Sequence, residues 1–308
     1  MPDFSIAIHG GAGTITPASM TPELEKAYKG ALAKALDKGY RVLADGGTAL
    51  DAVEIAVAEL EDSHLFNAGR GSVFTKEGKH EMDAAIMCGK TLEAGAVAGV
   101  RSIRNPVTLT RAIMEHSDHV FMSGYGAEEF ARKHGIAFEP EEYFYDSHRY
   151  KQWRDVRDTD VFMLDHTEER KFGTVGAVAR DEAGNLAAAT STGGMTNKNF
   201  NRIGDTPIIG SGTYANNKTC AISCTGHGEY FIRAVVAYDV SCLMEYKGYT
   251  LQQACNLVVK EKLVKFGGEG GLIAVDAAGN LALPFNSEGM YRGSRTSNGD
   301  AKVAIYKG

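Results

Sequence analysis

The stretch KFGTVGAVARD, residues 171–181, holds the feature on which the fold assignment depends. A charged run ends at Phe172 and Gly173, and Thr174 then opens an apolar segment with high β-propensity. Glycine is a poor residue at a strand start unless the backbone needs a conformation that other residues cannot adopt. Two interpretations follow. Either a loop ends here at a buried strand, or the chain cleaves its own backbone between Gly173 and Thr174.

The composition limits the class of protein. The chain has 308 residues, of which 44% are hydrophobic and 23% charged, as expected for a soluble globular protein of one large or two ordinary domains. Its net charge of −6 disfavours a nucleic-acid partner. No apolar run reaches the roughly 18 residues of a membrane span. The odd, unpatterned set of five cysteines and a first strand without a leader segment predict reduced thiols in the cytoplasm.

The hydrophobic pattern predicts alternating strands and helices. Strands are expected over 4–11, 72–75, 80–89 and 94–103, and helices over 21–45, 48–61, 105–115, 126–135, 228–246 and 250–265. Two D-x-A-G-N turns, within 176–191 and 272–287, predict similar antiparallel hairpins. Residues 140–173 are charge-rich and weakly periodic, which indicates an irregular helix and, over 143–173, a mobile connector.

The strands are rich in alanine, glycine and valine and alternate only weakly, which is typical of sheets covered on both faces. The economical architecture is an α+β protein with four layers: two stacked sheets and a layer of helices outside each, in the order αββα.

Thr174 is the candidate nucleophile. If its hydroxyl attacks the carbonyl of Gly173, an N→O acyl shift gives an ester that water cleaves, and glycine lets the backbone twist there. The product is an N-terminal threonine whose α-amine has a reference pKa of about 8, so that the amine can serve as the base for its own hydroxyl. The sequence contains no phosphate-binding loop, no G-x-S-x-G motif and no H-E-x-x-H motif that would favour another chemistry.

Three later motifs could complete a site. TSTGG places hydroxyl groups at a strand end, and Arg202 with Asp205 could hold a carboxylate and an ammonium group. CTGHGE offers the hydroxyl of Thr225 and backbone N–H groups for an oxyanion hole. Each motif also has an ordinary explanation: turn chemistry, a surface ion pair and a simple glycine turn.

Taken together and in order, these segments resemble one family along nearly the whole chain. The resemblance is to the plant-type L-asparaginase/isoaspartyl peptidase family of N-terminal-nucleophile hydrolases. It rests on IHGGAG, LFNAGRGSVF, EMDAAIM, AGAVAGV, RNPV, GTVGAVA, ATSTGGMTNK, RIGDTPIIGSG, SCTGHGE and ALPFNSEGMYR. It implies a single αββα unit over 1–308, cleaved into an α chain (1–173) and a β chain (174–308), and a dimer of such heterodimers.

The resemblance also implies roles for individual residues. The catalytic set would be Thr174 as nucleophile, its neighbour Thr192, the oxyanion-hole groups Thr225 and Gly226, and Asn67. The substrate-binding set would be Arg202 for the α-carboxylate, and Asp205 and Gly228 for the α-ammonium. No organic cofactor is implied. A structural sodium ion would be bound by backbone carbonyls of the loop after the second helix, with candidates Leu60, Glu61, Ser63, Phe66, Ala68 and Arg70.

The implied substrates are L-asparagine and β-aspartyl dipeptides, with no nucleic-acid or membrane partner. Within the same fold a glycosylasparaginase is an alternative, although the sequence offers neither a secretory signal nor paired cysteines. An uncleaved, non-catalytic homologue is another, as is a glycine-loop nucleotide-binding module without its lysine. Two departures from relatives are the short connector LDHTEERKFG (164–173) and His227.

Overall fold

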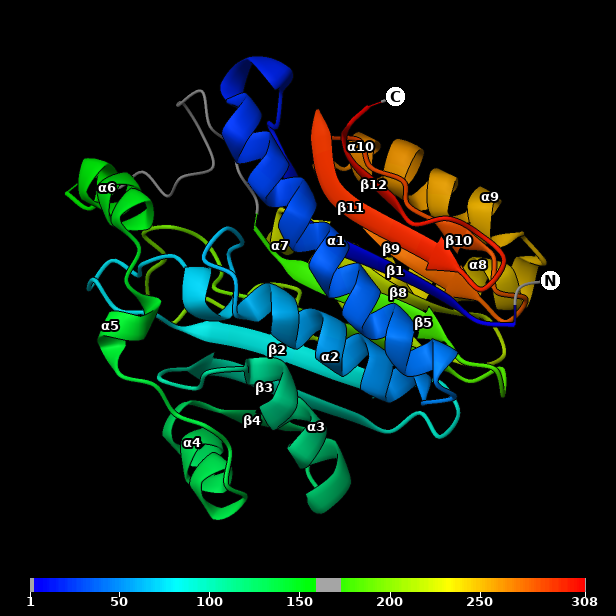
Figure 1. The fold of residues 1–308 in the computed structure, drawn as a ribbon, viewed down its shortest axis with the longest axis horizontal. Coiled ribbons are helices and arrows are strands. Elements are labelled where there is room, and N and C mark those ends of the chain that lie inside the picture. The colour runs from blue at the N-terminus through cyan, green and yellow to red at the C-terminus, as the bar shows by residue number, and fades with distance from the viewer. Residues whose placement is uncertain (1–2, 159–172, 308) are drawn as a thin grey trace.

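The computed structural model describes residues 3–158 and 173–307 (Figure 1). Its strands are β1 (Ser5–Gly13), β2 (Met82–Cys88), β3 (Ala94–Val100), β4 (Phe121–Ser123), β5 (Val175–Arg180), β6 (Leu186–Thr192), β7 (Thr213–Ala215), β8 (Cys220–Gly226), β9 (Gly270–Asp276), β10 (Leu281–Ala282), β11 (Gly289–Thr296) and β12 (Lys302–Tyr306). Its main helices are α1 (Pro22–Ala44), α2 (Ala49–Glu61), α3 (Pro106–His116), α4 (Gly124–Lys133), α5 (Glu141–Phe144), α6 (Ser147–Val156), α7 (Gly228–Ala234), α8 (Val236–Lys247), α9 (Leu251–Asn256) and α10 (Leu263–Lys265).

The strands form two sheets. The larger has eight strands in the order β12-β11-β1-β5-β6-β2-β3-β4, and all its pairs are antiparallel except β3 with β4. The smaller has the order β10-β9-β8-β7. Both predicted hairpins are present, because β5 pairs with β6 and β9 pairs with β10 across the two D-x-A-G-N turns.

Three hydrophobic cores separate four layers, and they confirm the αββα arrangement. The first lies between helices α1 and α2 and the large sheet, and includes Leu32, Val53 and Ile8. The second lies between the small sheet and α7 to α10, and includes Val240 and Ile222. The third fills the space between the sheets with residues of β1, β5, β6, β8 and β9, and is rich in alanine. Alanine lets the two sheets approach closely, which explains the weak alternation in the sequence.

Helix boundaries follow local sequence signals. Thr21 accepts a hydrogen bond from the backbone N–H of Leu24 and is followed by proline at the first helical position of α1. Thr48 caps α2 in the same way, accepting from the N–H of Asp51 (3.2 Å). Both starts agree with the prediction.

Several predicted elements differ in the structure. Residues 72–75 form no strand, only isolated bridges at Phe74 and Thr75. The helix expected over 228–246 is broken at Val235, which is left-handed (φ 48°) and separates α7 from α8. The helix expected over 250–265 contains a π-helical segment, Leu257–Lys262, between α9 and α10. Strands β11 and β12, which extend the large sheet beyond β1, were not predicted.

The first part of the predicted connector folds as helix α6. Asp146 caps it by accepting from the N–H of Arg149 (2.9 Å), and the buried Trp153 and Val156 face the protein. The rest of the connector, 159–172, lies outside the described residues. Among the helices that the structure describes, none has the length and apolar character needed to cross a bilayer.

Candidate active site

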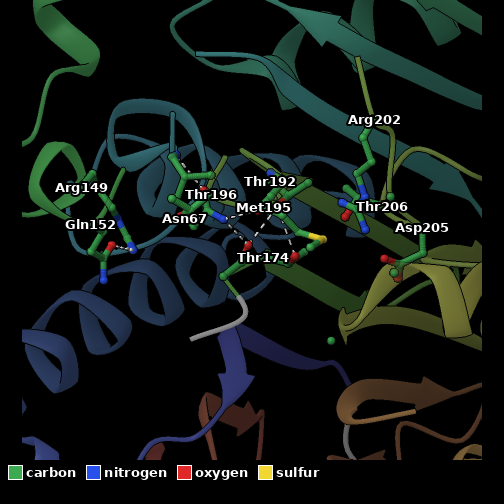
Figure 2. A pocket seen from close by; sticks show the side chains of 16 residues that line it. Asn67, Arg149, Gln152, Thr174, Thr192, Met195, Thr196, Arg202, Asp205 and Thr206 are labelled. Carbon is green, nitrogen blue, oxygen red and sulfur yellow. Dashed lines mark hydrogen bonds between the residues drawn. The ribbon is translucent and has the colours of Figure 1, made fainter. Parts of the chain in front are cut away.

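A pocket opens at the start of β5, next to the end of β6 (Figure 2). Its walls come from the loop after α2, from α6, from the loop between β6 and β7, and from the β8–α7 junction. The residues that line it are Asn67, Val73, Arg149, Gln152, Gly173, Thr174, Thr192, Gly194, Met195, Thr196, Arg202, Gly204, Asp205, Thr206, Gly226 and Gly228. Segments far apart in the sequence thus bring most of the predicted site residues to one place.

Thr174 lies at the middle of the pocket and is buried. Its hydroxyl donates to the hydroxyl oxygen of Thr192 (3.2 Å). Thr192 in turn donates to the carbonyl oxygen of Gly173 (2.9 Å) and accepts from the N–H of Gly194 (3.0 Å). The Thr192 hydroxyl is therefore fixed in orientation, with one proton given to the carbonyl that precedes the candidate nucleophile.

Asn67 provides the second side-chain hydrogen bond to the carbonyl oxygen of Gly173. Its side-chain amide donates to the carbonyl oxygens of Gly173 (3.0 Å) and Gly194 (2.6 Å). Its side-chain oxygen accepts from the N–H of Val73 (3.0 Å), which settles the orientation of the amide. The contact is close enough that a Cβ on Gly173 would lie 2.2 Å from the Cβ of Asn67, so only glycine fits at residue 173.

A buried series of hydrogen bonds through His9, Ser223 and Thr190 begins at the carbonyl oxygen of Thr174. The His9 ring contacts the carbonyl oxygen of Thr174 through Nδ1 (3.0 Å) and the hydroxyl of Ser223 through Nε2 (2.8 Å). Burial lowers the pKa of His9 to about 3, so the ring is neutral at pH 7. Because a carbonyl only accepts, Nδ1 must carry the proton, and Nε2 accepts from Ser223. Ser223 also bonds Thr190 (2.7 Å), so this series of hydrogen bonds joins the two sheets under the site.

Arg202 is held by an acidic residue that the sequence analysis did not single out. Its Nε and Nη2 donate to the two carboxylate oxygens of Glu229 (2.8 and 2.7 Å). His227 contacts the same carboxylate through Nε2 (3.0 Å). Burial alone would raise the pKa of Glu229, but the hydrogen bonds from His227 and Arg202 hold it well below its usual range. The fork presents the other edge of Arg202 to the pocket.

Asp205 lies beside this arginine and is almost fully buried. Burial raises the pKa of Asp205 to about 6, against the opposing charge of Arg202. One of its carboxylate oxygens, Oδ2, has no hydrogen-bond partner among the described residues. A Cβ on Gly228 would come within 2.9 Å of both Asp205 and Arg202, so glycine keeps open the space between the cation and the anion. That space suits a zwitterion.

Thr225 and Gly226 end β8; Gly226 is among the residues that line the pocket, whereas Thr225 is buried and is not among them. The Thr225 hydroxyl accepts from the N–H of Ala12 (3.2 Å), which leaves its own proton to be donated. Gly226 lines the pocket with a φ of +156°, and a Cβ there would lie 2.4 Å from the carbonyl oxygen of Glu269. Glycine is therefore required here, because the end of β8 passes too close to the start of β9 for a side chain to fit.

In the loop predicted to bind sodium, the backbone at two glycines passes close to carbonyl groups of the same segment. A Cβ on Gly69 would lie 2.5 Å from the carbonyl oxygen of Glu61, and one on Gly71 would lie 2.1 Å from that of Phe66. The carbonyls of Phe66 and Ala68 each accept a backbone N–H, from Ala68 and Gly71 respectively, which leaves a second lone pair on each oxygen. The predicted donors are carbonyl oxygens, a ligand type that hard cations accept, and the same loop carries Asn67.

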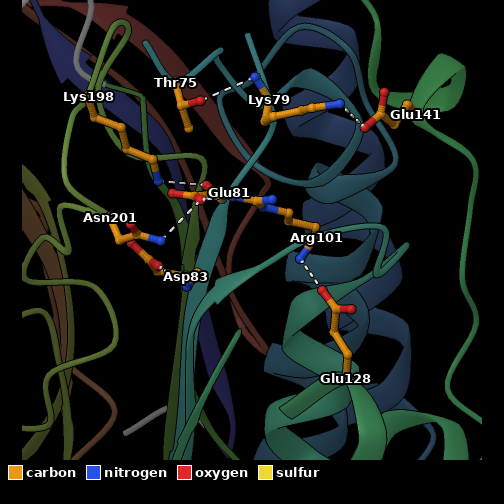
Figure 3. Close-up of polar contacts among 10 residues, drawn as sticks. Thr75, Lys79, Glu81, Asp83, Arg101, Glu128, Glu141, Lys198 and Asn201 are labelled. Atoms are coloured by element: carbon orange, nitrogen blue, oxygen red, sulfur yellow. Dashed lines mark hydrogen bonds and ion pairs between the residues drawn. The ribbon is translucent and has the colours of Figure 1, made fainter. Parts of the chain in front are cut away.

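A buried lysine, Lys198, lies close to the turn that follows Thr192, and Figure 3 shows its contact with Glu81. Lys198 is 2% exposed, and its ammonium donates to the backbone oxygen of Glu81 (2.7 Å). A Cβ on Gly194 would lie 3.0 Å from this ammonium, so the cation packs against the turn at Gly194, whose carbonyl oxygen accepts from Asn67. Burial lowers the pKa of Lys198 while the buried Asp83, paired in register with Thr192, raises it.

The site therefore contains residues that sequence reasoning did not assign. His9, Lys198 and Glu229 lie inside the motifs IHGGAG, ATSTGGMTNK and SCTGHGE. The sequence analysis identified these motifs but assigned no role to the three residues. Arg149 and Gln152 lie in the segment interpreted as an irregular connector and carry no motif signal.

Comparisons with known proteins agree on one family. A sequence profile described as asparaginase matches residues 3–305. An isoaspartyl peptidase of Salmonella typhimurium is 53% identical, over 98% of this chain and 98% of the relative. A probable isoaspartyl peptidase/L-asparaginase 2 of Arabidopsis thaliana is 40% identical over 100% of both chains. A plant-type L-asparaginase of Pyrococcus horikoshii is 42% identical over 93% of this chain and 94% of the relative.

Proposed function

The chain belongs to the asparaginase family, and from this premise we propose that it hydrolyses β-aspartyl dipeptides and the side-chain amide of L-asparagine through Thr174. The observation that carries the proposal is the pair of hydrogen bonds that Asn67 and Thr192 donate to the carbonyl oxygen of Gly173, next to the Thr174 hydroxyl. A glycosylasparaginase and a non-catalytic homologue are not favoured, because relatives at 40–53% identity are named isoaspartyl peptidase or L-asparaginase.

The first step is cleavage of the chain itself. The hydroxyl of Thr174 attacks the carbonyl carbon of Gly173, and the C–N bond breaks as an ester forms. Water then hydrolyses the ester, which leaves a carboxylate on Gly173 and a free α-amine and hydroxyl on Thr174. The negative charge that develops on the Gly173 oxygen is stabilised by the two side-chain donors already aimed at it, at 3.0 and 2.9 Å.

The same threonine then acts on substrate. Its α-amine takes the proton of its hydroxyl, the hydroxyl oxygen attacks the β-carbonyl carbon of the aspartyl group, and the leaving amine departs with a proton. Thr192 keeps the hydroxyl in position. We assign the oxyanion to the Thr225 hydroxyl and the N–H of Gly226. Water hydrolyses the β-aspartyl ester and restores the enzyme.

Substrate recognition falls to the charged pair at the far end of the pocket. We assign the substrate α-carboxylate to the free edge of Arg202 and the α-ammonium to the unpartnered oxygen of Asp205. Gly228 leaves room for the α-carbon between them. Because this end recognises only the aspartyl part, the leaving group can be ammonia or an amino acid.

The proposal extends to the ion, the assembly and the location. A sodium ion would be held by the carbonyls of Leu60, Glu61, Ser63, Phe66, Ala68 and Arg70, and would stiffen the loop that positions Asn67. The chains 1–173 and 174–308 would stay together as one unit, two such units would form the dimer, and the enzyme would work in the cytoplasm.

The test uses the purified protein and its Thr174→Ala variant. The wild type should give two masses under denaturing conditions that meet between Gly173 and Thr174, and should release aspartate from a β-aspartyl dipeptide and ammonia from L-asparagine. The variant should give one full-length mass and no turnover. A variant that still splits at this bond, or a cleaved wild type inactive on both substrates, would contradict the proposal.

A further inference from the structure

The pocket extends past Thr174 in the direction away from Arg202 and Asp205. Figure 2 shows Thr174 between these two residues on one side and Arg149 with Gln152 on the other. Asn67, Val73 and Thr196 complete this second end. None of the residues that the structure describes at this end is acidic. The two ends therefore differ in charge, because one holds a cation and an anion and the other holds a cation alone.

Arg149 is an unusual arginine. It is 9% exposed, and no ion pair with an acidic side chain is found for it within the described part of the chain. Within the described residues, its guanidinium makes two hydrogen bonds, and both go to neutral acceptors at the outer limit of bonding distance: the side-chain oxygen of Gln152 (3.3 Å) and the backbone oxygen of Leu65 (3.5 Å). A buried guanidinium with five donors is normally paired, so this one is poised for an anion that is not part of the described protein.

The chemistry of the substrate identifies the anion. With the aspartyl zwitterion at Arg202 and Asp205 and the β-carbonyl at Thr174, the order of residues along the pocket directs the leaving group toward Arg149 and Gln152. When it is an amino acid, its α-carboxylate carbon lies three bonds beyond the scissile carbon, within about 4 Å of it. Ammonia, the leaving group of L-asparagine, presents no such charge.

We propose that Arg149, with Gln152 beside it, binds the α-carboxylate of the leaving amino acid, so that this site is built for β-aspartyl dipeptides rather than for L-asparagine. The inference rests on the proposed function and deepens it. Arginine suits this task because its planar fork matches a carboxylate, and because the site excludes most water from around it.

The experiment compares three substrates: β-aspartyl-leucine, β-aspartyl-leucinamide, whose leaving group lacks the carboxylate charge, and L-asparagine. The wild type should show a kcat/KM about 10- to 100-fold higher for the dipeptide than for its amide, as expected for a charge-assisted hydrogen bond. Arg149→Gln should bring this ratio close to one, and Arg149→Lys should retain part of it. Arg149→Gln should also lower kcat/KM for the dipeptide more than for L-asparagine.

Arg154→Gln is the matched control, since Arg154 is an exposed arginine in the same helix and is not among the residues that line the pocket. It should keep the wild-type ratio. A wild-type ratio near one would overturn the inference without any variant. So would an Arg149→Gln enzyme that loses activity equally on the dipeptide and its amide, because that result would mean that Arg149 only holds α6 against Leu65. Failure of the wild type to hydrolyse any of the three substrates would instead refute the proposed function.

Discussion

Replacing Asn67 with aspartate should separate self-cleavage from folding. The change keeps an oxygen to accept from the N–H of Val73, but it removes the amide that donates to Gly173 and Gly194. A carboxylate would then face two carbonyl oxygens. Of the two side-chain donors on the Gly173 oxygen, only Thr192 would remain.

The expected magnitude follows from that count. Removal of one of two donors from a developing oxyanion typically costs about 10²- to 10³-fold in rate, or about 2.7–4 kcal/mol. The assay follows the full-length mass of freshly made protein against time, together with the two fragments. Asn67→Ala removes the same donors without adding charge and should slow cleavage to a similar extent.

Asn298→Asp serves as the control, because Asn298 is exposed in the turn between β11 and β12, at the opposite end of β1 from the site. It should mature at the wild-type rate. If Asn67→Asp and Asn67→Ala both cleaved at rates within about threefold of wild type, stabilisation of the negative charge on the Gly173 oxygen would not depend on Asn67. The reasoning from the two hydrogen bonds to that oxygen would then be refuted.

Four further predictions follow from the site. Glu229→Gln should raise KM about tenfold with a smaller change in kcat, because Arg202 loses its charged anchor; an unchanged KM would contradict this. Inhibition by L-aspartate should weaken as pH falls below about 6, where Asp205 becomes protonated, and Asp205→Asn should abolish that dependence along with most binding. The folded-state pKa of His9 is about 3, below its unfolded value near 6.5, so the unfolded state binds more protons between these values. Stability should therefore fall as pH drops from 6.5 toward 3, by at most about 1.4 kcal/mol per pH unit from this group, and less steeply in His9→Asn when followed by denaturant midpoints. Lys198→Met should slow cleavage more than it lowers the melting temperature, since the cation supports the turn next to Thr192; a loss of stability alone would assign it to the core.

The layers of the fold could be predicted because they follow from local patterns. The D-x-A-G-N turns indicate antiparallel hairpins, and the alanine-rich strands indicate sheets covered on both faces. The breaks at Val235 and within 257–262 could not be predicted, because the apolar periodicity continues through them and only packing decides the backbone. Strand β11 pairs with β1 nearly three hundred residues away, which no local signal reveals.

The residues of the site also fall into those that could be proposed from the sequence and those that could not. Thr174, Thr192, Arg202 and Asp205 could be proposed because reactive residue types stand in glycine-rich motifs, and the structure brings them into one pocket. Arg149 could not, because a single arginine in a charge-rich helix looks like an ordinary solvated residue. Its significance depends on burial and on the lack of an acidic partner among the described residues, which only the folded arrangement reveals.

The order of strands in the large sheet bears on how this protein can be made and stored. Strands β1 to β4 precede Thr174 and β5, β6, β11 and β12 follow it, yet β1 lies between β11 and β5, and β6 pairs with β2. If the backbone is cut before Thr174, as we propose, each separate fragment would have exposed strand edges and only part of the core, and we expect neither to fold alone. The two fragments would behave as one nicked protein that does not exchange partners, and refolding a mixture of separately produced fragments would fail where refolding the intact precursor succeeds.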